Sequence, residues 1–283
     1  AAAFSLERYN KSKAPLYYQT GCAVAVAPTA TCSGANRRAR NPLTGELLPA
    51  LFIGSFVPGT GDAYNGMVLR NDSSYPRGFR DQEPLQVQPR FGFSWDVFGN
   101  GKTAVRGSAG VFSQTRVSAN AVWNDVSRNP PISENPRIFY GNMDTLLASK
   151  STLFPSAVAG FDRNSPTPVT YSYSLGVQHD IGYGTVVDVA YVGSVSRHLQ
   201  QARNINQTPY GASFSKAGQD PTRFPGGVVP DCDTTISAAY KDVGLCFDGT
   251  KALPADFLRP YPGYGGITYF ENGGLSNYNA LQV

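Results

Sequence analysis

The sequence predicts an all-β fold, in which this chain forms part of an antiparallel, up-and-down transmembrane β-barrel. Three observations predict it: segments that alternate between apolar and polar residues, connections of very unequal length, and a composition poor in charge. Only 16% of the 283 residues are charged and 12% are aromatic, whereas about a quarter of a soluble domain is charged. The net charge of +4 is modest, and one short basic cluster at 37–40 does not indicate a nucleic-acid partner.

The clearest hairpin is expected at about residues 89–113. Its first strand places aromatic residues at 91, 93 and 95 between small or polar ones, which is the period of a strand with one apolar face. Asn100-Gly101 supplies a tight turn, and the return strand alternates in the same way. A second hairpin of this kind is expected at about residues 168–194, with its turn near Gly182 and Tyr183. Shorter strands are expected within Ala2–Arg8 and from Asn279 onward.

The connections between these strands are long. They cover about residues 9–88, 114–167 and 196–276. Structureless loops of this length are unusual in a compact domain, but transmembrane barrels combine short periplasmic turns with long extracellular loops. Residues 1–283 are therefore interpreted as a fragment of one barrel domain.

The two faces of each predicted strand differ in the way a barrel requires. The apolar face is expected to contact lipid, because a buried arginine there would cost about 2–4 kcal/mol at the membrane midplane. The charged residues expected to face the aqueous lumen are Arg90, Asp96, Arg106 and Asp188. The aromatic residues expected to form a girdle near the short turns are Trp95, Phe98 and Tyr183.

Four cysteines form two close pairs in the first and third long loops, Cys22 with Cys32 and Cys232 with Cys246. Neither pair has the Cys-x-x-Cys spacing of a zinc site, so two local disulfides are predicted, which requires an oxidising compartment. The only histidines, at 179 and 198, are isolated. No catalytic constellation, metal site or cofactor is predicted, and the protein is not expected to be an enzyme.

Several motifs are similar to those of a known family. They are Pro89-Arg90-Phe91-Gly92-Phe93-Ser94-Trp95-Asp96, Gly99-Asn100-Gly101-Lys102-Thr103-Ala104-Val105-Arg106-Gly107, Asn41-Pro42-Leu43-Thr44-Gly45, Ala190-Tyr191-Val192-Gly193-Ser194, Asn204-Ile205-Asn206-Gln207, Arg259-Pro260-Tyr261-Pro262-Gly263-Tyr264 and Ser276-Asn277-Tyr278-Asn279-Ala280-Leu281-Gln282. In this order they resemble the barrel of TonB-dependent outer-membrane receptors, in particular the Oar-like proteins that carry an N-terminal carboxypeptidase-regulatory-like domain.

The resemblance implies a bacterial outer-membrane barrel of about 22 strands, plugged by an N-terminal domain. Such a receptor takes up a bulky ligand with energy passed on by TonB. The implied partners are outer-membrane lipid, the TonB complex through N-terminal parts that this sequence does not include, and an extracellular ligand. At most about six strands are expected here, whereas closed barrels begin at about eight, so this segment is not expected to close alone.

Exposed aromatic side chains suit an oligosaccharide or another bulky ligand, because rings offer large and rigid contact surfaces. The candidate ligand-binding residues are Trp123, Tyr140, Tyr261, Tyr264, Tyr269 and Phe270. Packing of the loops against each other is the alternative role for these rings. At the level of the whole chain, the alternatives are a secreted or surface carbohydrate-binding β-sandwich and a secreted hydrolase with an unrecognised carboxylate pair.

Overall fold

The fold comes from a computed structural model, which describes residues 1–116, 125–139, 152–231 and 244–283. These residues form two compact units. We call Ala1–Leu69, Asp125–Gly160 and Asn204–Thr268 the loop unit, and Arg70–Asn124, Phe161–Arg203 and Tyr269–Val283 the sheet unit. The described part is mainly β-structure, with α3 (Ala255–Leu258) as a single turn of α-helix. None of its helices is long and apolar enough to cross a membrane.

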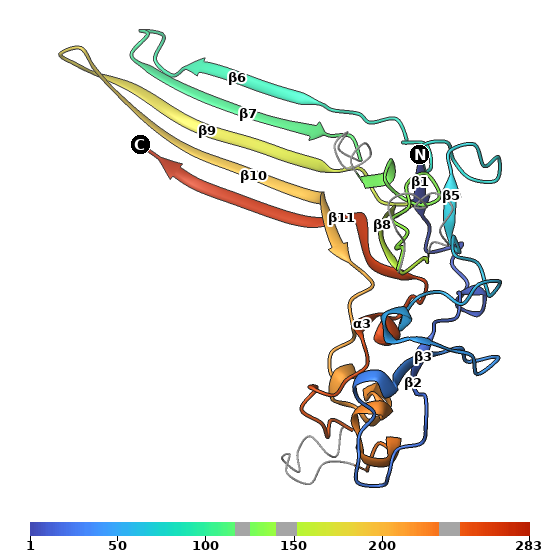
Figure 1. Cartoon of the computed structure of the whole chain (residues 1–283). Coiled ribbons are helices and arrows are strands. Elements are labelled where there is room, and N and C mark those ends of the chain that lie inside the picture. The colour runs from blue at the N-terminus through green and yellow to red at the C-terminus, as the bar shows by residue number, and fades with distance from the viewer. Residues whose placement is uncertain (117–124, 140–151, 232–243) are drawn as a thin grey trace. The chain divides into compact units, whose positions relative to one another are not determined.

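The sheet unit consists of long strands that lie side by side (Figure 1). They are β6 (Arg90–Asp96), β7 (Thr103–Ser113), β9 (Val169–Gly182), β10 (Thr185–Asn204) and β11 (Tyr264–Gln282), of which β10 ends and β11 begins in the loop unit. Their order is β11-β10-β9-β7-β6. The pairs β10–β9, β9–β7 and β7–β6 are antiparallel, so both predicted hairpins are confirmed.

Two strands are longer than the sequence pattern indicated. Strand β10 continues to Asn204 instead of ending near residue 194, and β11 begins at Tyr264 instead of Asn279. The reason is that the extra part of β10, from Arg197 onward, is mostly polar on both faces, with only Leu199 and Ala202 as apolar residues. A strand whose two faces are both polar lacks the alternation of apolar and polar residues by which a strand is recognised in a sequence.

The loop unit contains short strands in segments that were predicted as long loops. They are β1 (Ala2–Phe4), β2 (Gln19–Cys22), β3 (Arg37–Arg40), β4 (Leu47–Pro49), β5 (Met67–Leu69) and β8 (Ser156–Phe161), the last residue of which belongs to the sheet unit. Strands β2-β3-β4 form one antiparallel sheet. The other strands have the order β5-β1-β8-β11. The bridge between β1 and β8 is parallel, which departs from the wholly antiparallel arrangement that was predicted.

Short 3₁₀ helices complete the loop unit. They are η1 (Lys11–Lys13), η2 (Gly34–Asn36), η3 (Ala50–Phe52), η6 (Ala212–Phe214), η7 (Lys216–Gly218), η8 (Pro221–Arg223) and η9 (Pro225–Gly227). Three small apolar clusters hold these elements together, centred on Phe4, Tyr18 and Phe224. The predicted loops therefore have hydrophobic cores of their own.

Replacing Gly160 with alanine is expected to destabilise the loop unit by about 1–3 kcal/mol. A Cβ at this position would lie 2.3 Å from the carbonyl oxygen of Phe4, and that backbone oxygen cannot swing aside as a side chain could. Thermal unfolding of the full-length protein, followed by protease sensitivity of the loop unit, measures the effect. Gly265→Ala is the matched control, since the nearest atoms to its Cβ lie at 3.4 Å. Equal stability of the two variants would contradict the prediction.

Candidate functional site: the lipid-facing sheet and the aromatic centre of the loop unit

One face of the sheet unit is apolar and exposed. The strand register places residues of β6, β7, β9 and β10 in rows across this face. The central row is Phe93, Gly107, Leu175 and Tyr191, and its neighbours are Trp95, Val105, Val177 and Val189 on one side and Phe91, Ala109, Tyr173 and Gly193 on the other. Leu175 is 55% and Trp95 59% exposed. An exposed apolar face of this size requires an apolar surrounding.

Two glycines on this face lie beneath aromatic rings. A Cβ on Gly107 would lie 2.3 Å from the ring of Phe93, and a Cβ on Gly193 would lie 2.2 Å from the ring of Tyr173. The rings thus cover backbone that would otherwise be bare, which is a known way of stabilising glycine in a sheet.

The opposite face of the sheet unit is polar. Ser108 and Ser174 are joined by a hydrogen bond of 2.8 Å, and Thr170 and Ser196 by one of 3.0 Å. The predicted lumenal residues Arg90 and Arg106 alternate with the apolar positions of β6 and β7, which puts them on this face. The Asp96 carboxylate also holds the first turn, because it accepts hydrogen bonds from the N–H groups of Gly99 and Gly101.

A polar residue within the apolar face has hydrogen-bond partners on strands β9 and β10. Asn279 of β11 accepts hydrogen bonds through Oδ1 from the hydroxyls of Tyr173 and Tyr191, at 2.7 Å and 3.0 Å. Inside a bilayer an unpaired polar group costs several kcal/mol. This network therefore lets two tyrosines and an asparagine occupy a surface that lipid covers.

The apolar face has the height of a membrane. Along β10 it covers the nine residues from Val187 to Val195, and a transmembrane β-strand tilted by about 45° needs about 9–11 residues to cross the membrane. The predicted girdle residues lie at the turn end of this face, with Phe98 71% exposed and Tyr183 fully exposed. Within the described residues of the sheet unit this face is exposed, which does not fit the packed inner face of a β-sandwich.

Residues 44–283 match the family model described as outer membrane beta barrel domain. The chain belongs to this family. The protein is accordingly located in the bacterial outer membrane, and the apolar face of its sheet contacts membrane lipid. Neither a curated protein nor a solved structure matches the chain.

In the loop unit of this outer-membrane barrel protein, the motif that contains Asn206 contacts the motif that runs from Arg259 to Tyr264. The side chain of Asn206 is fully buried and donates through Nδ2 to the carbonyl oxygens of Tyr261, Tyr264 and Gly265, at 2.7–3.1 Å. Its Oδ1 accepts from the N–H of Tyr261 at 2.8 Å. The Arg259 guanidinium donates to the Asn206 carbonyl oxygen. Asn206 therefore holds the segment that leads into β11.

Aromatic rings gather around this segment. Phe4, Tyr9, Tyr261 and Tyr264 form a cluster with ring centroids 5.2–6.4 Å apart. The Tyr9 hydroxyl donates to the carbonyl oxygen of Pro262 at 2.8 Å. Burial raises the pKa of Tyr9 to about 12. The Tyr9 hydroxyl is thus a structural donor at physiological pH.

The structure places four of the six candidate ligand-binding residues. Tyr264, Tyr269 and Phe270 are buried, and Tyr261 is half-buried. In the sheet unit, Phe270 stacks on Phe161 with centroids 5.5 Å apart. The placed rings pack within their units, and a ligand role for them stays a prediction. Trp123 and Tyr140 lie outside the described residues.

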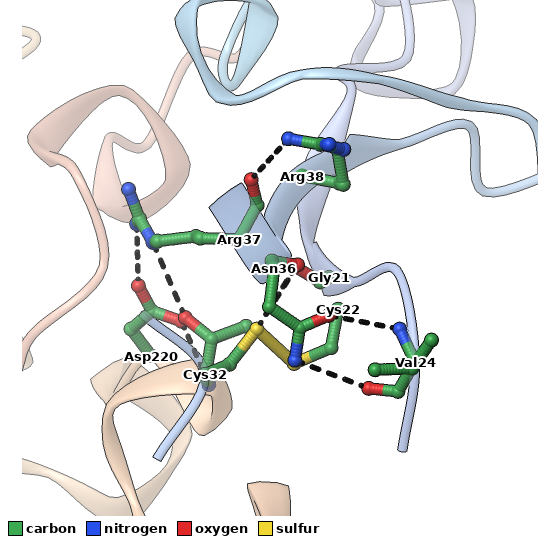
Figure 2. The surroundings of a disulfide bond; sticks show 9 residues. Gly21, Cys22, Val24, Cys32, Asn36, Arg37, Arg38 and Asp220 are labelled. Atoms are coloured by element: carbon green, nitrogen blue, oxygen red, sulfur yellow. Dashed lines mark hydrogen bonds and ion pairs between the residues drawn. A yellow bond between two sulfur atoms is a disulfide. The ribbon is translucent and has the colours of Figure 1, made fainter. Parts of the chain in front are cut away.

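The predicted disulfide between Cys22 and Cys32 is confirmed, with Cα atoms 5.9 Å apart (Figure 2). The Cys32 N–H also donates to the carbonyl oxygen of Thr222 at 2.9 Å, so the bond ties the first long segment to η8. Cys246 is disulfide-bonded as well. Its predicted partner, Cys232, lies outside the described residues.

A buried ion pair lies beside the first disulfide (Figure 2). The Asp220 side chain is fully buried, and its carboxylate accepts from the Arg37 guanidinium at 2.8 Å and from the Thr222 hydroxyl at 2.6 Å. Burial alone would raise the pKa of Asp220, but hydrogen bonds from Thr222, Arg37 and Thr20 outweigh burial and hold this pKa below its usual value.

Acid is expected to weaken the loop unit through Asp220. Because the folded pKa of Asp220 is lowered, its contribution to stability is complete above the ordinary carboxyl pKa of about 4 and is lost as the pH falls below that value. Thermal unfolding of the full-length protein between about pH 3 and pH 7 measures this. Asp220→Asn should be less stable at pH 7 and less sensitive to acid, and an unchanged pH profile in that variant would contradict the assignment.

A second buried polar cluster, in the sheet unit, was not predicted. The Arg80 guanidinium donates to the carbonyl oxygens of Asp162 and Arg116, and Asn272 Nδ2 donates to those of Arg116 and Pro166. Burial lowers the pKa of Arg80. The sequence offers no signal for this cluster, because its members come from segments without a periodic pattern.

Proposed function

We propose that this chain is a barrel segment of a TonB-dependent receptor of the Oar-like group, which takes up a bulky ligand such as an oligosaccharide across the outer membrane. The segment catalyses no reaction in this proposal. Its contribution is a wall of the barrel and part of the ligand-collecting surface outside the membrane.

The observation that carries the proposal is the inequality of the two ends of the sheet. At one end, β6 and β7 are joined by six residues and β9 and β10 by two. Long segments leave from the other end and form the loop unit. This unit has its own hydrophobic clusters, a disulfide, and an aromatic cluster next to the hydrogen bonds of Asn206. A pore that only admits small solutes does not need so large a folded unit, whereas a receptor for a bulky ligand does.

The test is growth and uptake in the native bacterium. A strain that lacks the full-length gene is compared with wild type on a panel of purified polysaccharides and oligosaccharides as sole carbon sources. The proposal expects a growth defect on at least one of them, restored by the wild-type gene only when TonB is present. The same growth and uptake in the deletion strain on every compound, or restoration without TonB, would overturn the proposal.

A further inference from the structure

The apolar face of the sheet unit is hollowed near the end from which the long segments leave. A groove of about 300 Å³ lies there, between Phe91 on β6 and the rings of Tyr171 and Tyr173 on β9. Its floor is β7, where Ala109 stands directly between Phe91 and Tyr173 in one cross-strand row. A methyl group between two large rings leaves space above it, so the groove follows from the residue sizes in this row.

The chemistry of the groove indicates a hydrocarbon. Its walls are the rings of Phe91, Tyr171 and Tyr173 with Pro89, and its floor is Ala109 and Val111, on the face that contacts lipid. The row between them, Arg90, Gly110 and Ser172, also lines the groove, but strand alternation directs its side chains to the opposite face. Its volume is at the lower end of the range for pockets that bind small molecules, about 300–1,000 Å³. An acyl chain is the apolar group that the membrane supplies at this surface.

A cation lies on the same face as the groove, one strand farther along the sheet on β10, and its guanidinium reaches to β11 on the side away from the groove. Arg197 of β10 pairs with Val169, one step beyond the pair of Val195 and Tyr171 that borders the groove. Its Nη1 donates to Asn277 Oδ1 and to the carbonyl oxygen of Ser196, both at 3.0 Å. Within the described ranges no carboxylate forms an ion pair with Arg197, whereas nearby Arg203 is paired with Glu271 at 2.8 Å.

We propose that the groove and Arg197 together bind a phosphorylated glycolipid of the outer leaflet, with one acyl chain in the groove and a phosphate on the Arg197 guanidinium. A guanidinium presents five N–H donors and binds phosphate oxygens in pairs. The Nε and Nη2 groups of Arg197 have the donors for this contact. The long loops of a barrel are extracellular, so this end of the apolar face lies in the outer leaflet.

Native mass spectrometry of the full-length protein in mild detergent tests the proposal, with purified lipid A as the probe and dephosphorylated lipid A and phosphatidylglycerol as comparisons. Lipid A should bind more tightly than either. Arg197→Gln should weaken lipid A binding about tenfold, which is the size expected for a charged hydrogen bond. Ala109→Trp should weaken lipid A and its dephosphorylated form equally, because it fills the groove.

Arg106→Gln is the matched control, since Arg106 lies in the same sheet on the opposite face. It should leave binding of lipid A unchanged. Heat-modifiable migration on gels verifies that each variant is folded. Unchanged binding of lipid A to both Arg197→Gln and Ala109→Trp would overturn the site. Binding of phosphatidylglycerol as tight as that of lipid A would overturn the assignment to a glycolipid.

Discussion

Asn206→Ala is expected to lower the free energy of unfolding of the loop unit by at least about 3 kcal/mol. The change removes the partner of three carbonyl oxygens and of one N–H, in a position with no access to water. Each buried polar group that loses its partner costs about 1–3 kcal/mol. Thermal unfolding of the full-length protein and the rate of trypsin cleavage within residues 204–268 measure the loss.

Two further variants define this result. Asn206→Asp keeps the shape and the accepting oxygen but removes the donor, so it should be nearly as damaging as alanine. Asn164→Ala, at an exposed asparagine, should have no effect. If Asn206→Ala had the melting temperature and the trypsin resistance of wild type, the hydrogen bonds of the Asn206 side chain would not stabilise the loop unit.

Leu175→Arg is expected to prevent or strongly reduce assembly of the barrel. Leu175 lies in the central row of the apolar face and is 55% exposed, so its side chain contacts lipid near the membrane midplane. An arginine there costs about 2–4 kcal/mol. The amount of folded full-length protein in isolated outer membranes, measured by heat-modifiable migration on gels, should fall accordingly.

The control for this substitution is its neighbour. Ser174 is adjacent in β9 but lies on the polar face, where its hydroxyl contacts that of Ser108. Ser174→Arg places the same charge at the same depth in an aqueous lumen and should assemble nearly normally. Equal loss of folded protein in both variants would show that the two faces do not differ in their surroundings.

The strands within the membrane were predictable because their environment is periodic. Lipid on one side and water on the other impose a period of two on β6, β7, β9 and the first part of β10. The turn at Asn100-Gly101 could be recognised because its φ > 0 conformation at Gly101 restricts the residue type. The disulfide Cys22–Cys32 was predictable because a local pair of cysteines without the Cys-x-x-Cys spacing of a zinc site has few other roles.

The candidate ligand-binding rings show the limit of this reasoning. Aromatic residues in a long loop were expected to be exposed, yet Tyr264 packs against Phe4 with centroids 5.4 Å apart and is almost completely buried. These two residues are far apart in the sequence. Which ring packs against another one so far away in the sequence depends on the path of the whole chain between them. No local sequence pattern contains that information.

The sequence by itself determined the all-β class, the two hairpins, the lipid-facing residues and the first disulfide, because each depends on neighbours a few residues apart or on a period of two. Only the tertiary structure decided that the long segments form a folded unit, that Asn206 clamps the entry to β11, and that Ala109 leaves a groove between two rings. Those features depend on contacts between segments distant in the sequence, where burial and hydrogen-bond partners are set by the packing of the whole unit.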